Sequence, residues 1–497
     1  MKRAFLLGLI AFAAGCTEEI IKQPPPAETN SEPAPPADET PVDPTPDPDP
    51  TPTKTPLVFP QVLSRGGPVI AKPKVVPIVF KNDPMAADIT SFTKKIATSS
   101  YWAGVGAEYG VGGITAGDTI VMDETPPANM TSTEVENWLI GKLTAAGAPL
   151  GTPDQSTLYA IFYPSGVTIQ FEDTEGSFGQ SCEGYGGYHY EAAAGQTKVG
   201  YSVVPRCGDL AELTVAASHE YFEWATDPLP LSKPAYNRLD DDHWAWQAVM
   251  IGELSDLCTF LDRDYISPTE IGNVVQRHWS NKLSKAGGFP CAPKKTVPYW
   301  QAIPDTPDEA IVPDYGGGFN KTIHTKAIRI KPGGSRTVDV QMYSDEAAGV
   351  SVPLRVMSFN EFYGQPSQSG FKYQLSSTRA KTGSTLQLTV DAPATDSYDV
   401  LVTMAYTSDT SVNFWPVLVV NDDDPNPGSK LTADGAKEAN VAKRVSVRDL
   451  PKKPETDGFN GRMRRGFGTR MESFSATRAA IIAELARASL PSRMMSE

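Results

Sequence analysis

Residues 210–228 read LAELTVAASHEYFEWATDP, and this stretch organises the first half of the chain. Apolar residues recur along it at helical spacing until a Thr-Asp-Pro breaker ends the pattern at Pro228. On such a helix His219 and Glu223 stand one turn apart on the same face. Imidazole and carboxylate groups in that arrangement can bind a metal ion, and Glu220 can act as general base toward a metal-bound water. The alternative is an exposed His–Glu pair on a helix surface.

A second acidic cluster lies downstream, in the stretch GELSDLC over residues 252–258. Glu253 and Asp256 stand about one helical turn apart there. We predict that zinc is the metal, that Glu253 is its third ligand and that Asp256 orients a ligand histidine. Asp227 joins Asp256 as an outer-shell acid, and both remain candidates for the third ligand, as does His189. The alternative interpretation of the cluster is a solvated acidic helix start.

A loop rich in aromatic residues and glycine, CEGYGGYHY over residues 182–190, provides a candidate wall for a substrate cleft. We predict that Tyr188 and His189 contact substrate there. The alternative for His189 is a structural histidine whose hydrogen bonds are satisfied within the fold.

The elements around these motifs predict an α+β protein. Strand patterns alternate with helical patterns, one of which starts with the capping box Thr131–Glu134. This order suits a zincin-like α/β metallohydrolase domain over residues 57–298, in which a sheet is backed by the helix that carries the metal ligands. The expected strands are 74–80, 120–122, 158–163 and 199–204, and the expected helices include 88–96 and 210–224.

A second region, residues 318–421, predicts a β-sandwich domain. Apolar and polar residues alternate there at period two, and turn clusters separate the runs. The following residues 422–497 form a basic tail, with thirteen Lys and Arg against seven acids from Lys437 onward, and we predict disorder apart from a short helix at 475–490. The expected sandwich strands are 326–330, 337–342, 351–356, 385–390 and 398–404.

The N-terminus predicts export and a lipid anchor. Two basic residues, an apolar run over residues 4–13 and Ala14-Gly15-Cys16 resemble a bacterial lipoprotein signal over residues 1–16, which implies acylation of Cys16. Residues 17–56 are rich in Pro, Asp, Glu and Thr, and such a segment forms an extended, disordered stalk. The expected location is the bacterial cell envelope, in the outer membrane or at the cell surface. The alternative is an ordinary secretory peptide with an incidental cysteine.

Four further cysteines predict disulfides in an exported protein. Three connectivities are open, and we favour Cys182–Cys207 with Cys258–Cys291 because each bond then closes a short local loop. The alternative is that the four are buried free thiols.

The overall charge argues against nucleic acid as a partner. The 497 residues include 44 Lys and Arg against 59 Asp and Glu, a formal net charge of -15, which repels phosphate backbones. After the N-terminal run, no stretch is apolar enough to predict a transmembrane helix.

The motifs together are similar to the EXORDIUM or phosphate-induced family, whose members are plant apoplastic proteins with secreted bacterial relatives. The similarity covers about residues 75–293 and implies an extracellular, disulfide-bonded domain with a zincin-like H-E-x-x-E helix, but no established reaction. The motifs that carry it are Gly-Tyr-His189, His219 to Pro228, Gly252 to Cys258, His278 to Asn281 and Pro290-Cys291.

We therefore predict a surface-anchored zinc metallohydrolase, and more specifically a peptidase that uses a metal-bound water. Its partners would be the membrane, through the lipid anchor, and a protein or cell-wall glycan substrate. The alternative is a non-catalytic envelope module that binds glycan or a protein partner on a zincin-like scaffold. A third hypothesis is a structural lipoprotein whose basic tail touches an anionic envelope polymer.

Overall fold

The computed structural model describes eleven stretches of the chain between residues 57 and 421. The predicted signal with Cys16, the stalk at 17–56 and the tail at 422–497 lie outside them. None of the helices in these stretches is both long enough and apolar enough to span a membrane. The described stretches are 57–173, 176–183, 185–250, 252–259, 265–294, 298–313, 322–346, 349–362, 366–395, 397–406 and 412–421.

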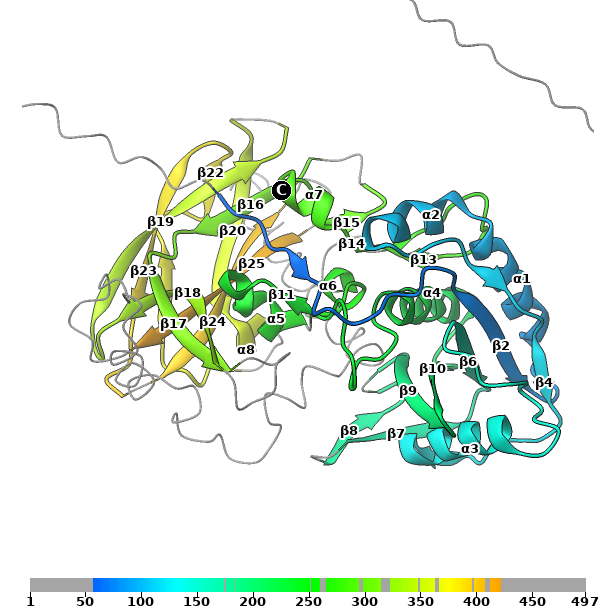
Figure 1. Ribbon diagram of the computed structural model, residues 1–497. Coiled ribbons are helices and arrows are strands. Elements are labelled where there is room, and N and C mark those ends of the chain that lie inside the picture. The colour runs from blue at the N-terminus through cyan, green and yellow to red at the C-terminus, as the bar shows by residue number, and fades with distance from the viewer. Residues whose placement is uncertain are drawn as a thin grey trace, which may run out of the picture. The chain divides into compact units, whose positions relative to one another are not determined.

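The first half of the described chain is built on a mixed sheet (Figure 1). The order of its strands is β3-β2-β6-β10-β9, and β4 also pairs with β2. Strands β2, β6 and β10 run parallel, whereas β9 is antiparallel to β10 at the edge. The bounds are β2 Lys74–Phe80, β3 Thr115–Ala116, β4 Ile120–Met122, β6 Thr157–Tyr163, β9 Tyr188–Ala194 and β10 Thr197–Pro205. The four predicted strands in this half are therefore confirmed.

Helices cover both faces of this sheet, which explains why its central strands are apolar on both sides. Helices α1 (Ala86–Ala97) and α4 (Leu210–Thr226) pack on one face, and α3 (Ser132–Thr144) packs on the other. Asp209 caps α4 by accepting hydrogen bonds from the N–H groups of Ala211 and Glu212. The predicted capping box is present at the start of α3.

Short elements surround this three-layer core. Their bounds are β1 Val62–Leu63, α2 Ser100–Gly106, η1 Ala107–Tyr109, β5 Asn129–Thr131, β7 Thr168–Asp173, β8 Gly176–Gln180, β11 Arg238–Leu239, η2 Asp241–His243, α5 Trp244–Met250, α6 Asp256–Thr259, β12 Tyr265–Ile266, β13 Val275–Gln276, β14 His278–Trp279, α7 Asn281–Lys285 and β15 Cys291–Ala292. Two of them, α6 and β13, contribute Asp256 and Gln276 to the candidate site described below.

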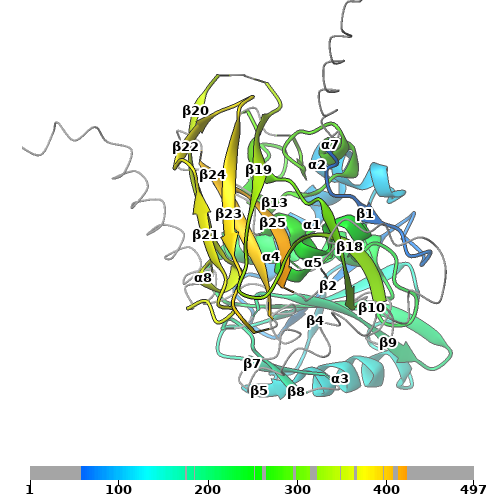
Figure 2. The same ribbon diagram turned by 90° about the vertical axis from the view of Figure 1, so that its left-hand side faces the viewer.

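The second half consists of two sheets, with the orders β16-β19-β23-β21 and β17-β18-β25-β24-β20-β22 (Figure 2). All five predicted strands of this region are present. Strands β16 and β17 precede residue 318, the predicted start of the region, and pair with β19 and β18. The bounds are β16 Trp300–Pro304, β17 Asp308–Pro313, β18 Thr322–Ile330, β19 Ser335–Ser344, β20 Ser351–Ser358, α8 Phe359–Phe362, β21 Lys372–Leu375, β22 Arg379–Lys381, β23 Thr385–Asp391, β24 Tyr398–Tyr406 and β25 Val412–Asn421.

Buried aromatic side chains join the two halves into one hydrophobic core. The ring of Trp246 on α5 lies 5.2 Å from that of Trp415 on β25 and 5.9 Å from that of Trp279. Aromatic pairs at such distances bury large areas and pack in edge-to-face geometry. The fold is α+β, with a β-rich second half.

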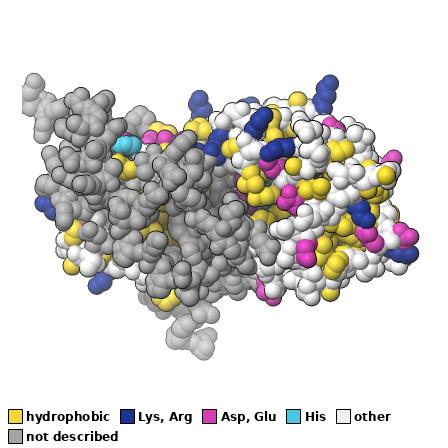
Figure 3. All heavy atoms as spheres, turned by 60° about the horizontal axis from the view of Figure 1, so that its bottom comes forward, with side chains coloured by type: hydrophobic (Ala, Val, Ile, Leu, Met, Phe, Trp, Pro, Cys, Tyr) yellow, Lys and Arg dark blue, Asp and Glu magenta, His cyan; other side chains and the backbone are white. Residues whose placement is uncertain are grey.

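On the face in Figure 3, charged side chains of both signs are interspersed over the described residues.

Candidate metal centre

Helix α4 carries the centre of the site, as its sequence predicts. His219, Glu220 and Glu223 are each at most 3% exposed, because α4 lies between the sheet and the segments that follow it. Nε2 of His219 lies 2.9 Å from Oε2 of Glu223, one turn further along the helix. The alternative of an exposed His–Glu pair on a helix surface is therefore wrong. Since buried ionisable groups are costly unless they are paired or bind a metal, the burial itself calls for a partner.

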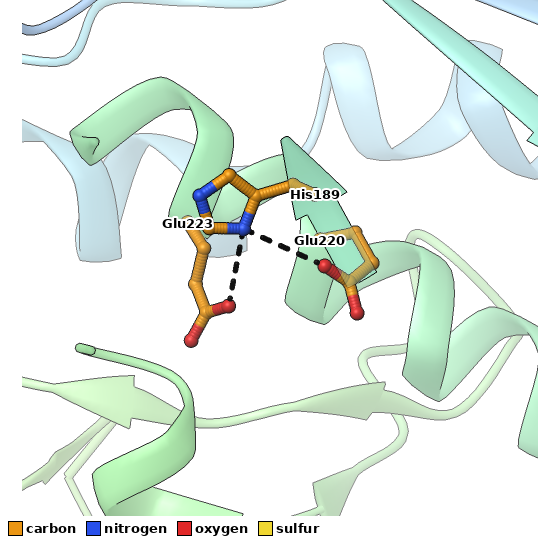
Figure 4. A group of neighbouring side chains, drawn as sticks. All are labelled: His189, Glu220 and Glu223. Carbon is orange, nitrogen blue, oxygen red and sulfur yellow. Dashed lines mark ion pairs between the residues drawn. The ribbon is translucent and has the colours of Figure 1, made fainter. Parts of the chain in front are cut away.

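Two groups of side chains in the described residues could hold a metal ion, and both contain Glu223. The first is His219, Glu223 and Asp256, in which Nε2 of His219 lies 3.4 Å from Oδ1 of Asp256. The second is His189, Glu220 and Glu223 (Figure 4). In this second group Nδ1 of His189 lies 3.5 Å from Oε2 of Glu223 and 3.7 Å from Oε2 of Glu220.

Outer hydrogen bonds orient His219. Its Nδ1 lies 2.9 Å from Oε1 of Gln276 on β13. The amide of Gln276 is itself fixed, because its Nε2 donates to the carbonyl of Ser255 at 2.6 Å and to Oγ1 of Thr259 at 3.0 Å. Oε1 of Gln276 must therefore accept a hydrogen bond from the N–H at Nδ1 of His219, so Nε2 is the ring nitrogen that faces Glu223 and Asp256.

His189 on β9 is oriented in the same way. Its Nε2 lies 3.2 Å from the backbone carbonyl of Asp227, which can only accept a hydrogen bond. The other ring nitrogen, Nδ1, then faces Glu220 and Glu223. Both histidines thus have one nitrogen tied to an acceptor and the other directed at carboxylates, the usual arrangement of metal-ligating histidines.

The carboxylate of Glu223 is fixed by the backbone at the start of α6. The N–H groups of Ser255 and Asp256 donate to its Oε1 at 3.2 and 3.0 Å. This leaves Oε2 to face both histidines. The beginning of α6 therefore both holds Glu223 and presents Asp256.

Glu220 differs from Glu223 in its surroundings. Its Oε2 is buried and has no hydrogen-bond partner in the part of the chain that the structure describes. Its Oε1 packs against the backbone of Gly187, where an added Cβ would come within 2.5 Å. Gly187 is therefore needed for the close approach between Glu220 and the segment that leads into β9.

The remaining predicted site residues lie outside the two groups. Glu253 is partly buried in the turn before α6, close enough to Glu223 that the charge of Glu223 adds to burial in raising the pKa of Glu253. The carboxylate of Asp227 accepts from the N–H of Ala235 at 2.6 Å and from Nδ2 of Asn237 at 2.8 Å, so it holds a loop, and only its backbone carbonyl meets His189. Tyr188 lies on the opposite face of β9 from His189, with its ring 4.9 Å from that of Phe171.

The electrostatics reflect the crowding of carboxylates around two histidines. Burial alone would lower the pKa of His219, but the charges of Glu223 and Glu220 raise that pKa well above its ordinary value. Burial, with the charge of Glu223, raises the pKa of Glu253 to about 8 and that of Asp256 well above its usual range. Burial opposes ionisation of Glu223 as well, yet the adjacent His219 keeps the pKa of Glu223 low.

Gln276 and Ser255 are the functional residues that sequence reasoning missed. Ser255 Oγ also lies 2.8 Å from Nδ1 of the buried His278, whose Nε2 lies 2.6 Å from the hydroxyl of Tyr101. Gln276 lies in a two-residue strand just before the motif His278 to Asn281 but outside it, and only the approach of β13 to α4 gives it a role. For Ser255, its place between Glu253 and Asp256 was the one available signal.

Two disulfides support the site, and both predicted pairings are confirmed. Cys258–Cys291 ties α6, which presents Asp256, to β15. Cys182–Cys207 ties the segment before β9 to the segment before α4. The alternative of buried free thiols is wrong. Disulfides are typical of proteins that fold outside the cytoplasm, so they indicate an extracellular or surface protein.

Comparisons with known proteins show no family for this chain. No protein-family model and no curated protein matches it. Among solved structures, domains 4 and 5 of the S-layer protein SbsC match at 12% identity over 21% of this chain and 61% of theirs, with a TM-score of 0.15. Domains 1–6 of SbsC match at 10% identity over 30% of this chain and 22% of theirs, also with a TM-score of 0.15. The chain thus spans about three fifths of the first structure, and such TM-scores carry no inference.

Proposed function

We propose that the chain is a zinc metallohydrolase whose metal ligands are His219, Glu223 and Asp256. The observation that carries the proposal is the oriented set of donor atoms at these three residues. Two ligand atoms about 2.1 Å from a tetrahedral zinc ion lie about 3.4 Å apart. The separations of 2.9 and 3.4 Å from Nε2 of His219 to the two carboxylates are close to that value. We assign the third ligand position to Asp256 and not to Glu253, because Asp256 is grouped with His219 and Glu223.

The other residues of the site have separate parts in the proposal. A bound zinc ion would lower the pKa of a coordinated water and so supply a nucleophile near neutral pH. Glu220, next to His219 on α4, would take up the proton as general base. Gln276 would keep His219 in the tautomer that binds metal, and the N–H groups of Ser255 and Asp256 would hold Glu223 in place.

The edge strand β9 supports a peptide as the substrate. In the described part of the chain β10 is its only neighbour in the sheet, so one side of β9 has backbone N–H and C=O groups without strand partners. An extended peptide can add to such an edge as a further strand. His189 lies on β9, and a peptide bound along this edge would pass beside the site. We therefore propose a peptidase; a relation to the EXORDIUM family, which the sequence motifs suggest, remains a separate proposal.

Lipid anchoring through Cys16 belongs to the same proposal. The motif Ala14-Gly15-Cys16 favours acylation and attachment to the cell envelope. Cys16→Ser should abolish acylation and release the protein from the detergent phase. Continued partitioning of the variant into detergent would contradict the anchor and leave the metal site unaffected.

Metal analysis of variants tests the hydrolase. The wild-type chain, supplied with zinc, should retain stoichiometric metal after dialysis. Glu223→Ala should lose most of it, because too few donors remain. Glu220→Gln should keep the metal and lose hydrolysis of a protein substrate, because an amide takes up no proton. A wild-type chain without stoichiometric metal would reject the hydrolase and favour the non-catalytic binding module.

A further inference from the structure

The group His189, Glu220 and Glu223 has no ligand role in the proposed zinc site beyond the shared Glu223. It offers one imidazole nitrogen and two carboxylates, with donor atoms that all lie within 4.8 Å of one another. All three side chains are buried. The two groups share Glu223 and differ in every other member. This second group is therefore a separate set of potential ligands.

The direction of the His189 ring points to a ligand. Its Nε2 is tied to the carbonyl of Asp227 at 3.2 Å, so the lone pair of Nδ1 is directed at the two glutamates. A lone pair facing two carboxylate oxygens is unfavourable unless a cation or a proton lies between them. At 3.5 and 3.7 Å, Nδ1 is too far from either oxygen for a good hydrogen bond.

The unpartnered oxygen of Glu220 points to the same place. Oε2 of Glu220 is buried and has no hydrogen-bond partner among the described residues, and Glu220 as a whole is only 2% exposed. Zinc at the first group would be neutralised by the carboxylates of Glu223 and Asp256. The buried charge of Glu220 would then face Nδ1 of His189 at 3.7 Å, a gap that a cation bound between the two would close.

We infer that His189, Glu220 and Glu223 form a second, weaker site for a divalent cation, bridged to the proposed zinc site by Glu223. The inference rests on the proposed function and adds regulation to it. The class of cation is that of zinc, since imidazole together with carboxylate suits it. The second site is weaker because it shares Glu223 with the first site, whose bound ion repels a second cation. Occupation would engage Glu220, the proposed base, so excess metal would inhibit hydrolysis.

Equilibrium dialysis of the full chain against zinc chloride, with metal counted per chain, tests this inference. The wild type should bind one zinc tightly and a second at higher concentration. His189→Ala and the milder His189→Gln should bind one. His324→Ala is the matched control: His324 is exposed, its Nδ1 lies 3.7 Å from Oε2 of Glu309, and its loss should leave two zinc ions per chain.

The outcomes separate this inference from the proposed function. One zinc per wild-type chain would overturn the second site and leave the hydrolase standing, whereas no zinc would overturn both. Two zinc ions in both His189 variants would place the second ion elsewhere and overturn the inference. Loss of all zinc in His189→Gln, with a wild-type unfolding transition, would assign His189 to the first site and also overturn it. Glu220→Gln should weaken only the second binding step.

Discussion

The two halves of the molecule bury carboxylates in opposite ways. In the β-rich half, Asp399 on β24 accepts hydrogen bonds from the hydroxyls of Ser358 at 2.9 Å, Ser369 at 2.6 Å and Tyr373 at 2.8 Å. In the α+β half, Oε2 of Glu220 accepts no hydrogen bond from any of the described residues. Both side chains are almost completely buried. Asp399 and Glu220 are therefore both buried, but only Asp399 is surrounded by hydroxyl groups that donate hydrogen bonds to it.

This difference separates a structural acid from a candidate ligand. A buried carboxylate with its own hydroxyl donors is complete without anything from outside. Around Glu220 and Glu223 the neighbours are ring nitrogens directed at oxygens, an arrangement that a cation completes. Removing donors from Asp399 should therefore cost stability, and changing the α4 carboxylates should cost metal binding.

The largest expected effect is on zinc affinity, in Glu223→Gln. We expect a loss of more than about 100-fold, because the change removes a charged ligand and not only an outer-shell contact. Competition with a chromogenic chelator measures it. The control is Asp399→Asn, which should keep wild-type affinity. If both variants lost zinc affinity equally, the site on α4 would not differ from the structural carboxylate of the β-rich half.

A smaller loss of zinc affinity is expected for Gln276→Leu. Loss of the acceptor for Nδ1 of His219 frees the ring to rotate, and outer-shell changes of this kind cost about 10–100-fold in affinity. Gln301→Leu is the matched control: Gln301 is a buried glutamine of the β-rich half that donates to the carbonyl of Phe414. Unchanged affinity in Gln276→Leu would show that Gln276 does not position His219.

In the metal-free protein the order of the effects should be reversed: the change in the β-rich half should lower stability more than the change on α4. With chelator present, Asp399→Ala should lower the free energy of unfolding by about 1–3 kcal/mol, because one buried and two partly buried hydroxyls lose their acceptor. Glu220→Gln should leave that free energy unchanged or raise it, since Oε2 of Glu220 is buried and accepts no hydrogen bond from the described residues. Denaturant titration measures both. A large destabilisation by Glu220→Gln would mean that this carboxylate has a structural role.

The smallest expected effect is a pH dependence of the chelated protein. Burial raises the pKa of Glu253 from 4.5 to about 8, and carboxylates raise the pKa of His219 despite its burial. The folded state then binds more protons than the unfolded state between about pH 4.5 and 8, so stability falls as pH rises through this window. The melting temperature should drop by a few degrees, and by less in Glu253→Gln. A melting temperature that rises with pH would show that the pKa values of Glu253 and His219 are not raised in the folded protein.

The predictions from sequence succeeded where short-range patterns decide the structure. The capping box at Thr131, the apolar strand Lys74–Phe80 and the helix carrying His219 all depend on neighbours within a few residues. Disulfide pairing within local loops was predictable for the same reason. The placement of Glu253 was less predictable, because it depends on how the turn before α6 meets α4.

The sequence by itself determined that His219, Glu220 and Glu223 share one helix, because a period of 3.6 residues sets which side chains neighbour one another. Only the tertiary structure decided that Asp256 and His189 complete the two groups around them. These residues come from α6 and β9, segments far apart in the chain. Their approach to α4 is set by the packing of the core, the disulfide at Cys258 and the hydrogen bonds through Gln276, none of which a local pattern encodes.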